Sequence, residues 1–204
     1  MRNPKRVSHV GIYAGTFDPV HDGHVAFAEA ALHNCGLDKI FFLVEPRPRR
    51  KQGVRAFEHR VRMVELAIAD HAKFGLIVLE QAQFTVAETL PILKARFKSA
   101  ELHMLMGEDV LKHLASWPHL EEFVRDVSIV IGIRENSEET VRQQIETLHK
   151  VRHLHPHYSM FRTDLSRYNS SKIRLDLRRG KIPEGIHEEV ARYIKQNGLY
   201  LPVE

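Results

Sequence analysis

One stretch, Gly15-Thr16-Phe17-Asp18-Pro19-Val20-His21-Asp22-Gly23-His24, constrains this chain more than any other. It follows a short apolar run, His9 to Ala14, and precedes an alanine-rich amphipathic segment, Gly23 to Asn34, which predicts the order strand, tight loop, helix. Gly15 lets the backbone approach an anion closely, and a helix beginning near Asp22 directs amide hydrogens at the same place. His21 and His24 add further donors. The stretch therefore predicts a phosphate-binding site.

Apolar runs of strand length alternate with longer segments of helical period along the chain, which is typical of a parallel sheet covered by helices on both faces. The 204 residues, 43% of them hydrophobic, suffice for one core and are few for two. We therefore expect one α/β domain, residues 1–204, with a Rossmann-like doubly wound parallel sheet and a helical C-terminal extension over about 166–204. The expected strands are 9–14, 40–44, 75–79, 102–106, 127–133 and 158–161, and the main expected helices are 23–34, 56–71, one starting after Thr85, 137–149, 171–179 and 183–196.

Four segments that follow strands carry residues suited to ligand binding. They are the Gly15 loop, the basic loop from Glu45 to Val54, the helix start at Thr85, and Gly107-Glu108-Asp109. Thr85 and Glu88 fit a capping box, in which each side chain accepts the other residue's amide hydrogen. In open parallel sheets, ligands bind at the carboxyl ends of the strands, where the strand order reverses, so these segments should face one crevice.

The charge balance and the single cysteine limit the classes of protein to which this chain can belong. The 30 Lys and Arg against 26 Asp and Glu give +4, an excess that a nucleotide site explains as well as a nucleic-acid surface would. The basic residues from Arg47 to Lys51 lack interleaved aromatics, which favours a phosphate-facing loop over nucleic-acid binding. The single cysteine, Cys35, excludes an intrachain disulfide and suits a reducing cytosol. We expect a cytoplasmic chain with no signal peptide, membrane span or nucleic-acid partner, and the oligomeric state stays open, a homo-oligomer included.

Two groups of histidines raise the alternative of a metal site. His21 and His24 could ligate zinc, but such a site needs further ligands that the sequence does not place nearby, so phosphate donation is favoured. His153, His155 and His157 alternate, yet Pro156 interrupts them, which favours a polar loop. No metal-binding residues are assigned.

Two motifs resemble one superfamily. Gly15 to His24 is similar to the signature of HIGH-type nucleotidyltransferases, and Asn169-Ser170-Ser171-Lys172-Ile173-Arg174 resembles the ISSTxIR motif of the same superfamily. The second motif is suited to phosphate binding independently of this resemblance, because Ser170 or Ser171 would cap a helix whose amide end, with Arg174, can hold a polyphosphate.

Further segments resemble nicotinate-nucleotide adenylyltransferases in particular. Phe84 to Leu90 is similar to that family's (Y/F)T-x-x-TL segment, and Gly107-Glu108-Asp109 with Trp117 resembles its GxD…W segment. Arg134 matches an arginine at a strand end, and Val190 to Tyr200 resembles the family's closing segment. The likeness covers most of the chain and weakens between Asn136 and Leu165.

The resemblance implies transfer of AMP from ATP to a pyridine mononucleotide, with release of pyrophosphate. His24 would be the main stabiliser of the reacting phosphate, with His21 and Thr16 as companions. The other implied roles are phosphate contact by Lys51, a ribose hydroxyl contact by Asp109, ATP binding by Gly15, Ser170, Ser171 and Arg174, and acceptor binding by Thr85, Trp117 and Arg134. Mg²⁺ would arrive with ATP rather than in a protein cage.

Departures from the family pattern keep other functions open. The family's PPHK loop reads Pro48-Arg49-Arg50-Lys51, and Pro118, which has no amide hydrogen, follows Trp117. One alternative is nucleotidyl transfer to another acceptor, such as nicotinamide mononucleotide, or of another nucleotide. A second alternative is a nucleotide-binding regulator without turnover.

Overall fold

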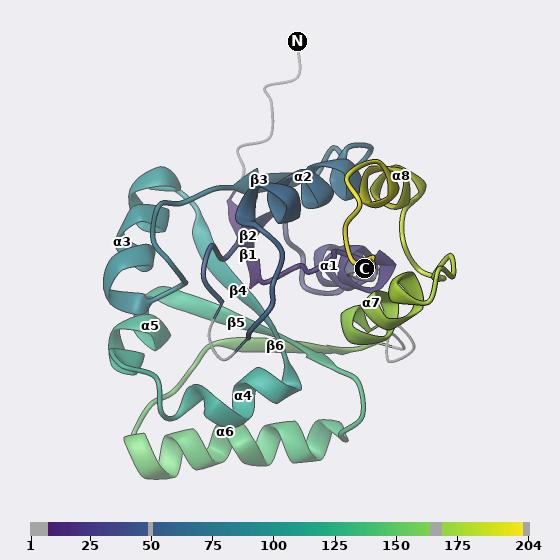
Figure 1. Ribbon diagram of the computed structural model, residues 1–204. Coiled ribbons are helices and arrows are strands. Elements are labelled where there is room, and N and C mark those ends of the chain that lie inside the picture. The colour runs from purple at the N-terminus through teal and green to yellow at the C-terminus, as the bar shows by residue number, and fades with distance from the viewer. Residues whose placement is uncertain (1–7, 49–50, 164–168, 202–204) are drawn as a thin grey trace.

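The computed structural model describes residues 8–48, 51–163 and 169–201. Six parallel strands in these residues form one sheet with the order β3-β2-β1-β4-β5-β6 (Figure 1). The strands are β1 (His9–Gly15), β2 (Lys39–Val44), β3 (Phe74–Ile77), β4 (Glu101–Gly107), β5 (Val127–Ile133) and β6 (Tyr158–Arg162). The strand order reverses between β1 and β4, so the predicted doubly wound sheet is confirmed. Its ligand crevice is expected where these two strands end, at Gly15 and Gly107.

Helices cover both faces of the sheet (Figure 1). One face carries α1 (Asp22–Asn34), α2 (Phe57–Ile68), α7 (Ser170–Arg178) and α8 (Glu188–Gln196), and the other carries α3 (Val86–Arg96), α4 (Glu108–Leu114), α5 (Leu120–Asp126) and α6 (Glu138–Arg152). Side chains alternate between the two cores, so Ile12 packs under α3 to α6 while Tyr13 packs under α1, α2 and α8. Strands buried on both faces explain the nearly unbroken apolar runs of the sequence.

Some element ends differ from the predicted ones. The last helix begins at Glu188 rather than at Pro183, because the preceding residues form a turn in which Gly185 has a φ of 78°. α2 ends at Ile68, where the chain turns and the His71 N–H donates to the Ile68 carbonyl. The predicted strand near Tyr158 is present as β6 at the edge of the sheet, and residues 153–157 before it form a loop, as predicted.

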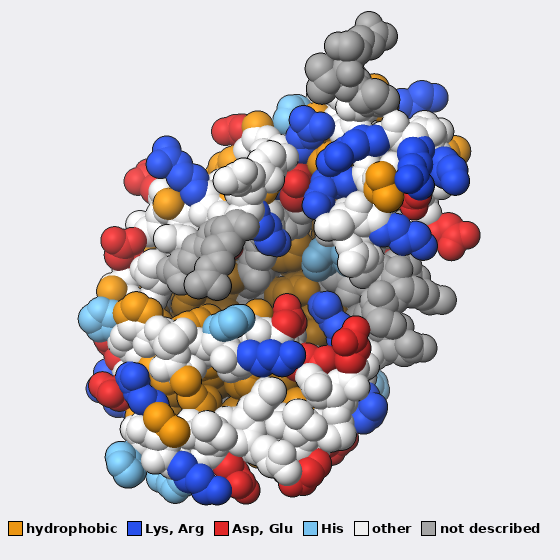
Figure 2. Space-filling view, turned by 60° about the horizontal axis from the view of Figure 1, so that its bottom comes forward, with side chains coloured by type: hydrophobic (Ala, Val, Ile, Leu, Met, Phe, Trp, Pro, Cys, Tyr) orange, Lys and Arg blue, Asp and Glu red, His pale blue; other side chains and the backbone are white. Residues whose placement is uncertain are grey.

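The surface mixes both signs of charge. Figure 2 shows a face that is hollowed near its middle, where hydrophobic side chains form the floor and both acidic and basic side chains stand around the rim. No helix in the described part of the chain combines the length and the apolar character that crossing a membrane requires.

Candidate active site

The predicted histidine pair lies just beyond the end of β1, at the carboxyl edge of the sheet: His21 is the residue before α1, and His24 lies in its first turn. The two imidazole rings stack, with centroids 3.7 Å apart. The backbone N–H of His21 donates to Nδ1 of His24 over 3.2 Å. Because Nδ1 accepts, the proton of the neutral His24 ring sits on Nε2. His24 therefore offers an Nε2–H donor.

Both rings are neutral near pH 7. Burial lowers the pKa of His21 from 6.5 to about 4, and the positive charge of Arg134 contributes to this shift. Burial also lowers the pKa of His24 well below 6.5, with further contributions from His21, Arg134 and Lys51. Cations therefore converge on two neutral hydrogen-bond donors. That arrangement favours an anion at this place.

Acidification is expected to destabilise the protein through His21. The pKa of this buried side chain is lower in the folded chain than near 6.5 in the unfolded chain, so the unfolded state binds more protons between these values. This group then contributes a loss of about 2 kcal/mol in unfolding free energy at pH 5 relative to pH 7.5. Urea unfolding at both pH values measures the loss, which His21→Gln should reduce. An unchanged pH dependence in His21→Gln would contradict the assignment.

The basic loop after β2 reaches the loop after β1. Nζ of Lys51 donates to Oγ1 of Thr16 over 3.0 Å, although 35 positions separate the two residues. Thr16 is buried, whereas Lys51 is exposed. The predicted convergence of these two loops is therefore confirmed at this contact. Arg49 and Arg50, the replacements in the same loop, lie outside the described residues.

Asp18 joins the loop after β1 to distant parts of the chain. Nη1 of Arg174 donates to the Asp18 carbonyl over 2.6 Å and lies 3.9 Å from Oδ2 of its carboxylate. Oδ1 of the buried carboxylate accepts from the Arg55 N–H over 3.2 Å and from the Tyr200 hydroxyl over 2.6 Å. The two superfamily motifs, far apart in sequence, are thus in direct contact.

Asn169 caps α7, which corrects the predicted cap at Ser170 or Ser171. The side-chain oxygen of Asn169 accepts two N–H groups of the first turn, over 2.8 and 3.3 Å. Ser170 Oγ instead donates to the Pro19 carbonyl over 3.1 Å, and Ser171 Oγ accepts from Nη2 of Arg174 over 3.0 Å. The asparagine amide reaches both N–H groups at once, so the serine hydroxyls are available to contact other groups.

Tyr200→Phe is expected to lower the unfolding free energy by about 1.5–3 kcal/mol, because the Tyr200 hydroxyl donates to the buried carboxylate of Asp18. Urea unfolding measures the loss. Tyr193→Phe is the matched control, since the Tyr193 hydroxyl lies 2.8 Å from Nδ1 of His59, an imidazole rather than a carboxylate, at a half-buried site. Its expected loss is about 0.5–1.5 kcal/mol. A loss in Tyr200→Phe no larger than in the control would show that the carboxylate contact adds nothing.

Arg60 on α2 is a buried residue of the site that the sequence pattern did not reveal. Its side chain is 1% exposed, and its guanidinium donates four hydrogen bonds to backbone carbonyls. The acceptors are Arg55 at 2.9 Å and Thr16, Glu45 and Pro46 at 2.8 Å each. One side chain therefore holds the loop after β1 against the loop after β2. An arginine in an amphipathic helix is expected to lie on the surface. The only sequence signal that Arg60 is buried is its position within the apolar stripe of α2.

At the end of β4, the side chains of Asp109 and Arg134 gather beside Gly107. A Cβ atom on Gly107 would lie 2.6 Å from Oδ1 of Asp109 and 3.9 Å from Nη2 of Arg134, so a larger residue would displace the carboxylate. Both side chains are exposed. The buried carboxylate of Glu108 accepts two N–H groups of the loop after β5, at 2.9 and 3.2 Å, and so fixes the chain next to Arg134.

An apolar cavity of about 240 Å³ opens at the start of α3. Its lining consists of Phe84, Thr85, Val86, Ala87, Glu88, Trp117, Pro118 and His119. Trp117 is half-buried and packs edge-on against Phe123, with ring centroids 5.4 Å apart. The indole therefore contacts the core and also lines the cavity, together with the amide end of α3.

Only half of the predicted capping box forms. Oγ1 of Thr85 accepts the Glu88 N–H over 3.1 Å, as expected. The Thr85 N–H, however, donates to Oγ1 of Thr89 over 3.0 Å rather than to the carboxylate of Glu88. The Thr89 hydroxyl is fully buried and needs a partner, whereas Glu88 is exposed and is solvated by water.

Comparisons with known proteins agree with this geometry. The family model described as cytidylyltransferase-like matches residues 12–175, a span that contains both motifs. A protein of Neisseria meningitidis serogroup C named probable nicotinate-nucleotide adenylyltransferase is 34% identical, over 94% of this chain and 98% of its own length. The chain belongs to the cytidylyltransferase-like family. The nicotinate-nucleotide adenylyltransferase of Bacillus subtilis is 29% identical to this family member, over 94% of the chain and 97% of its own length.

Solved structures share the fold of this cytidylyltransferase-like chain. The nicotinic acid mononucleotide adenylyltransferase of Plasmodium falciparum, complexed with NaAD, has a TM-score of 0.77 at 20% identity, with 95% of this chain and 97% of the other covered. The same protein complexed with APC has a TM-score of 0.75 at 19% identity. The family and the Rossmann-like α/β fold predicted from the sequence motifs are confirmed.

Proposed function

We propose that this protein transfers AMP from ATP to nicotinate mononucleotide and releases pyrophosphate, a step of NAD biosynthesis. The observation that carries the proposal is the contact set around the loop after β1. Lys51 reaches this loop at Thr16 and Arg174 reaches it at Asp18, so two cations from distant segments contact the loop that leads to the stacked, neutral histidine pair. The proposed acceptor, nicotinate mononucleotide, follows from the names of the bacterial relatives.

The chemistry needs a donor at the reacting phosphate rather than a base. A phosphate oxygen of the mononucleotide attacks the α-phosphorus of ATP, the bond to the β-phosphate oxygen breaks, and pyrophosphate leaves. A phosphomonoester with a second pKa near 6 is largely dianionic at pH 7, so it attacks without losing a proton to the protein. The site must hold both substrates in line and offset charge on the α-phosphate. Neutral histidines with N–H donors are suited to that task.

We assign roles by position around this reaction. His24 would donate its Nε2–H to the α-phosphate, with His21 and Thr16 beside it. Lys51 would contact the phosphates. The remaining ATP contacts would come from Gly15, Asp109 at the ribose, Ser170, Ser171 and Arg174.

The cavity at the start of α3 is the proposed site of the nicotinate ring. Trp117 offers an aromatic face for stacking, and the first-turn amides of α3 after Thr85 suit a carboxylate. Pro118 also lines the cavity but has no amide hydrogen to donate. Recognition of the carboxylate therefore rests on the α3 amides, and Arg134 at the crevice is proposed to contact the acceptor.

Mg²⁺ is proposed to enter with ATP. Around the crevice, the described residues contain no group of three His, Cys, Asp or Glu side chains close enough to share an ion. The carboxylate of Asp18 already accepts from Arg55 and Tyr200. Oxygen ligands for Mg²⁺ would then come mainly from the ATP phosphates, and the ion would supply charge neutralisation at the leaving pyrophosphate.

Pyrophosphate release by the purified protein tests the proposal. ATP, CTP and GTP are each combined with nicotinate mononucleotide or nicotinamide mononucleotide. We expect release with ATP and nicotinate mononucleotide at a higher kcat/KM than with any other pair. Faster release with nicotinamide mononucleotide, or with CTP, would overturn the proposed acceptor or nucleotide. ATP binding without release for any acceptor would favour the regulator.

A further inference from the structure

Three potential metal-ligating side chains meet at the edge of the sheet opposite the candidate active site. His9 begins β1, and Glu101 and His103 lie at the start of β4. In the parallel register His9 faces Glu101 and Gly11 faces His103, so all three side chains project from one face of the sheet. The sequence does not reveal this group, because its strands are distant along the chain and only the alternation of Glu101 with His103 marks it.

The two distances from His9 to the other ligand atoms are close to the spacing around a tetrahedral ion. Nδ1 of His9 lies 3.2 Å from Nε2 of His103 and 3.4 Å from Oε2 of Glu101, and the three ligand atoms all lie within 4.8 Å of one another. Zinc bonds of 2.0–2.2 Å at the tetrahedral angle place neighbouring ligand atoms about 3.3–3.6 Å apart. Two imidazole nitrogens and one carboxylate oxygen also form a donor set that zinc uses in proteins.

The backbone around these residues is fixed independently of any ion. The Asp38 carboxylate accepts the N–H groups of Ser8 and His9 over 2.8 and 3.0 Å. The Glu101 N–H donates to the Ser8 carbonyl over 2.7 Å. His9 and Glu101 are therefore held in register before a ligand binds, which lowers the cost of assembling the site.

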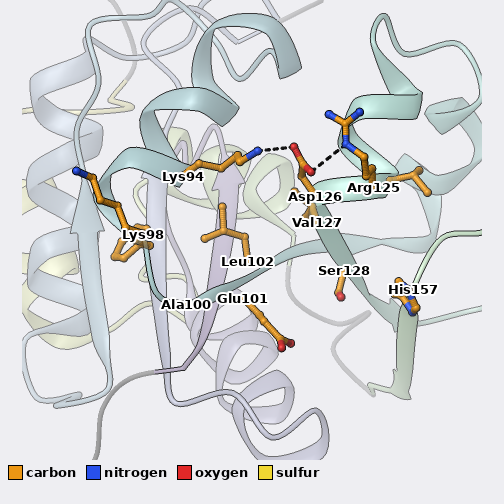
Figure 3. A pocket seen from close by; sticks show the side chains of 12 residues that line it. Lys94, Lys98, Ala100, Glu101, Leu102, Arg125, Asp126, Val127, Ser128 and His157 are labelled. Atoms are coloured by element: carbon orange, nitrogen blue, oxygen red, sulfur yellow. Dashed lines mark hydrogen bonds and ion pairs between the residues drawn. The ribbon is translucent and has the colours of Figure 1, made fainter.

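The carboxylate of Glu101 is directed toward the histidines. Glu101 borders a cavity of about 610 Å³ between α3 and α5, in which Lys94 and Arg125 pair with Asp126 (Figure 3). In Figure 3 the Glu101 carboxylate points away from this ion pair. The side chains of His9 and Glu101 are 41% and 73% exposed, so a water molecule can reach a fourth ligand position.

We propose that His9, Glu101 and His103 bind one zinc-type divalent transition-metal ion, with water as the fourth ligand. The ion would tie the start of β1 to the start of β4. These strands have seven residues each, so the site lies roughly 20 Å from their carboxyl ends, and its role is structural rather than catalytic.

Zinc binding to the untagged, metal-stripped full chain tests the proposal, with a chromophoric chelator as competitor. We expect one tight zinc ion per chain and a rise in Tm of about 5–10 °C at a hundredfold excess over Kd. His9→Ala and His103→Ala should each weaken binding by at least about 100-fold, since losing an outer-shell partner alone costs 10- to 100-fold. Glu101→Gln, which preserves the shape of the side chain, should weaken it as well. His33→Ala, at an exposed histidine of α1, is the control and should bind as the wild type does.

Two results would overturn the site. One is wild-type protein that binds no zinc at micromolar concentration, which would leave only a hydrogen bond between the two imidazoles. The other is unchanged tight binding in both histidine variants, which would place the ion on other residues. Pyrophosphate release by the variants is measured in parallel and should stay unchanged, which also shows that they fold. Cobalt(II) substitution supplies a spectroscopic readout, since visible bands of a tetrahedral ion should be lost in His103→Ala.

Discussion

Replacing His24 by alanine is expected to lower kcat roughly 10²- to 10³-fold, the scale of losing one preorganised donor at a reacting group. The reason is that the tautomer and the neutral charge of the His24 ring are set by the protein. Its Nδ1 accepts the His21 N–H, and burial lowers its pKa, so a neutral Nε2–H donor is in place before substrate arrives. Steady-state kinetics with ATP and nicotinate mononucleotide measure the loss. Because the donor acts on charge that develops in the transition state, kcat should fall much more than KM rises.

The matched control for this variant is His33→Ala, an exposed histidine in the last turn of the same helix. Its kcat should equal that of the wild type. Urea unfolding of His24→Ala should show that the variant is folded under assay conditions. Near-normal turnover in His24→Ala would remove this residue from the reaction and leave the loop as a binding element only.

Arg60→Ala is expected to lower the unfolding free energy by about 3–5 kcal/mol, because it leaves backbone carbonyls without the donors they have in the folded chain. Four carbonyl oxygens accept from this guanidinium, and the side chain is 1% exposed. The loops after β1 and β2 would also lose their common attachment, so KM for ATP should rise. Urea unfolding gives the stability, and steady-state kinetics with ATP varied at saturating nicotinate mononucleotide give the change in KM for ATP.

Arg62→Ala is the matched control for Arg60→Ala. Arg62 lies on the same helix, is exposed and pairs with Glu65 over 3.0 Å, so its loss should cost less than about 1 kcal/mol. Arg60→Lys keeps the charge but not the planar fork of donors, so its loss in unfolding free energy should lie between those of Arg60→Ala and Arg62→Ala. An Arg60→Ala protein as stable as Arg62→Ala would show that water satisfies the carbonyls.

Local patterns along the chain predicted most of the architecture. Runs such as Val127 to Ile133 could be assigned as buried strands, because strands covered on both faces are apolar throughout. The order strand, loop, helix around Gly15 to His24 could also be predicted, and the phosphate binding expected of this loop stays a prediction. Helix ends were less predictable, since the choice among Asn169, Ser170 and Ser171 as cap depends on what else those side chains contact.

The family and the reaction class could also be predicted from the sequence, because short motifs and the spacing between them indicate both. The comparisons confirm the family relation. The roles of individual residues, from His24 at the phosphate to Trp117 at the acceptor, stay predictions that the variants above will test.

The order of strands and helices and the family could be predicted without the structure, because each depends on residues that are neighbours along the chain. How the site is held together depends on contacts that form only in the folded chain. The buried Arg60 donates to the Thr16 carbonyl, and Asp18 accepts hydrogen bonds from Arg174 and Tyr200. On the opposite edge of the sheet, the His9 ring contacts the His103 ring. These contacts join residues 44 to 182 positions apart. Their partners are chosen by sheet order and helix packing, which no local pattern encodes.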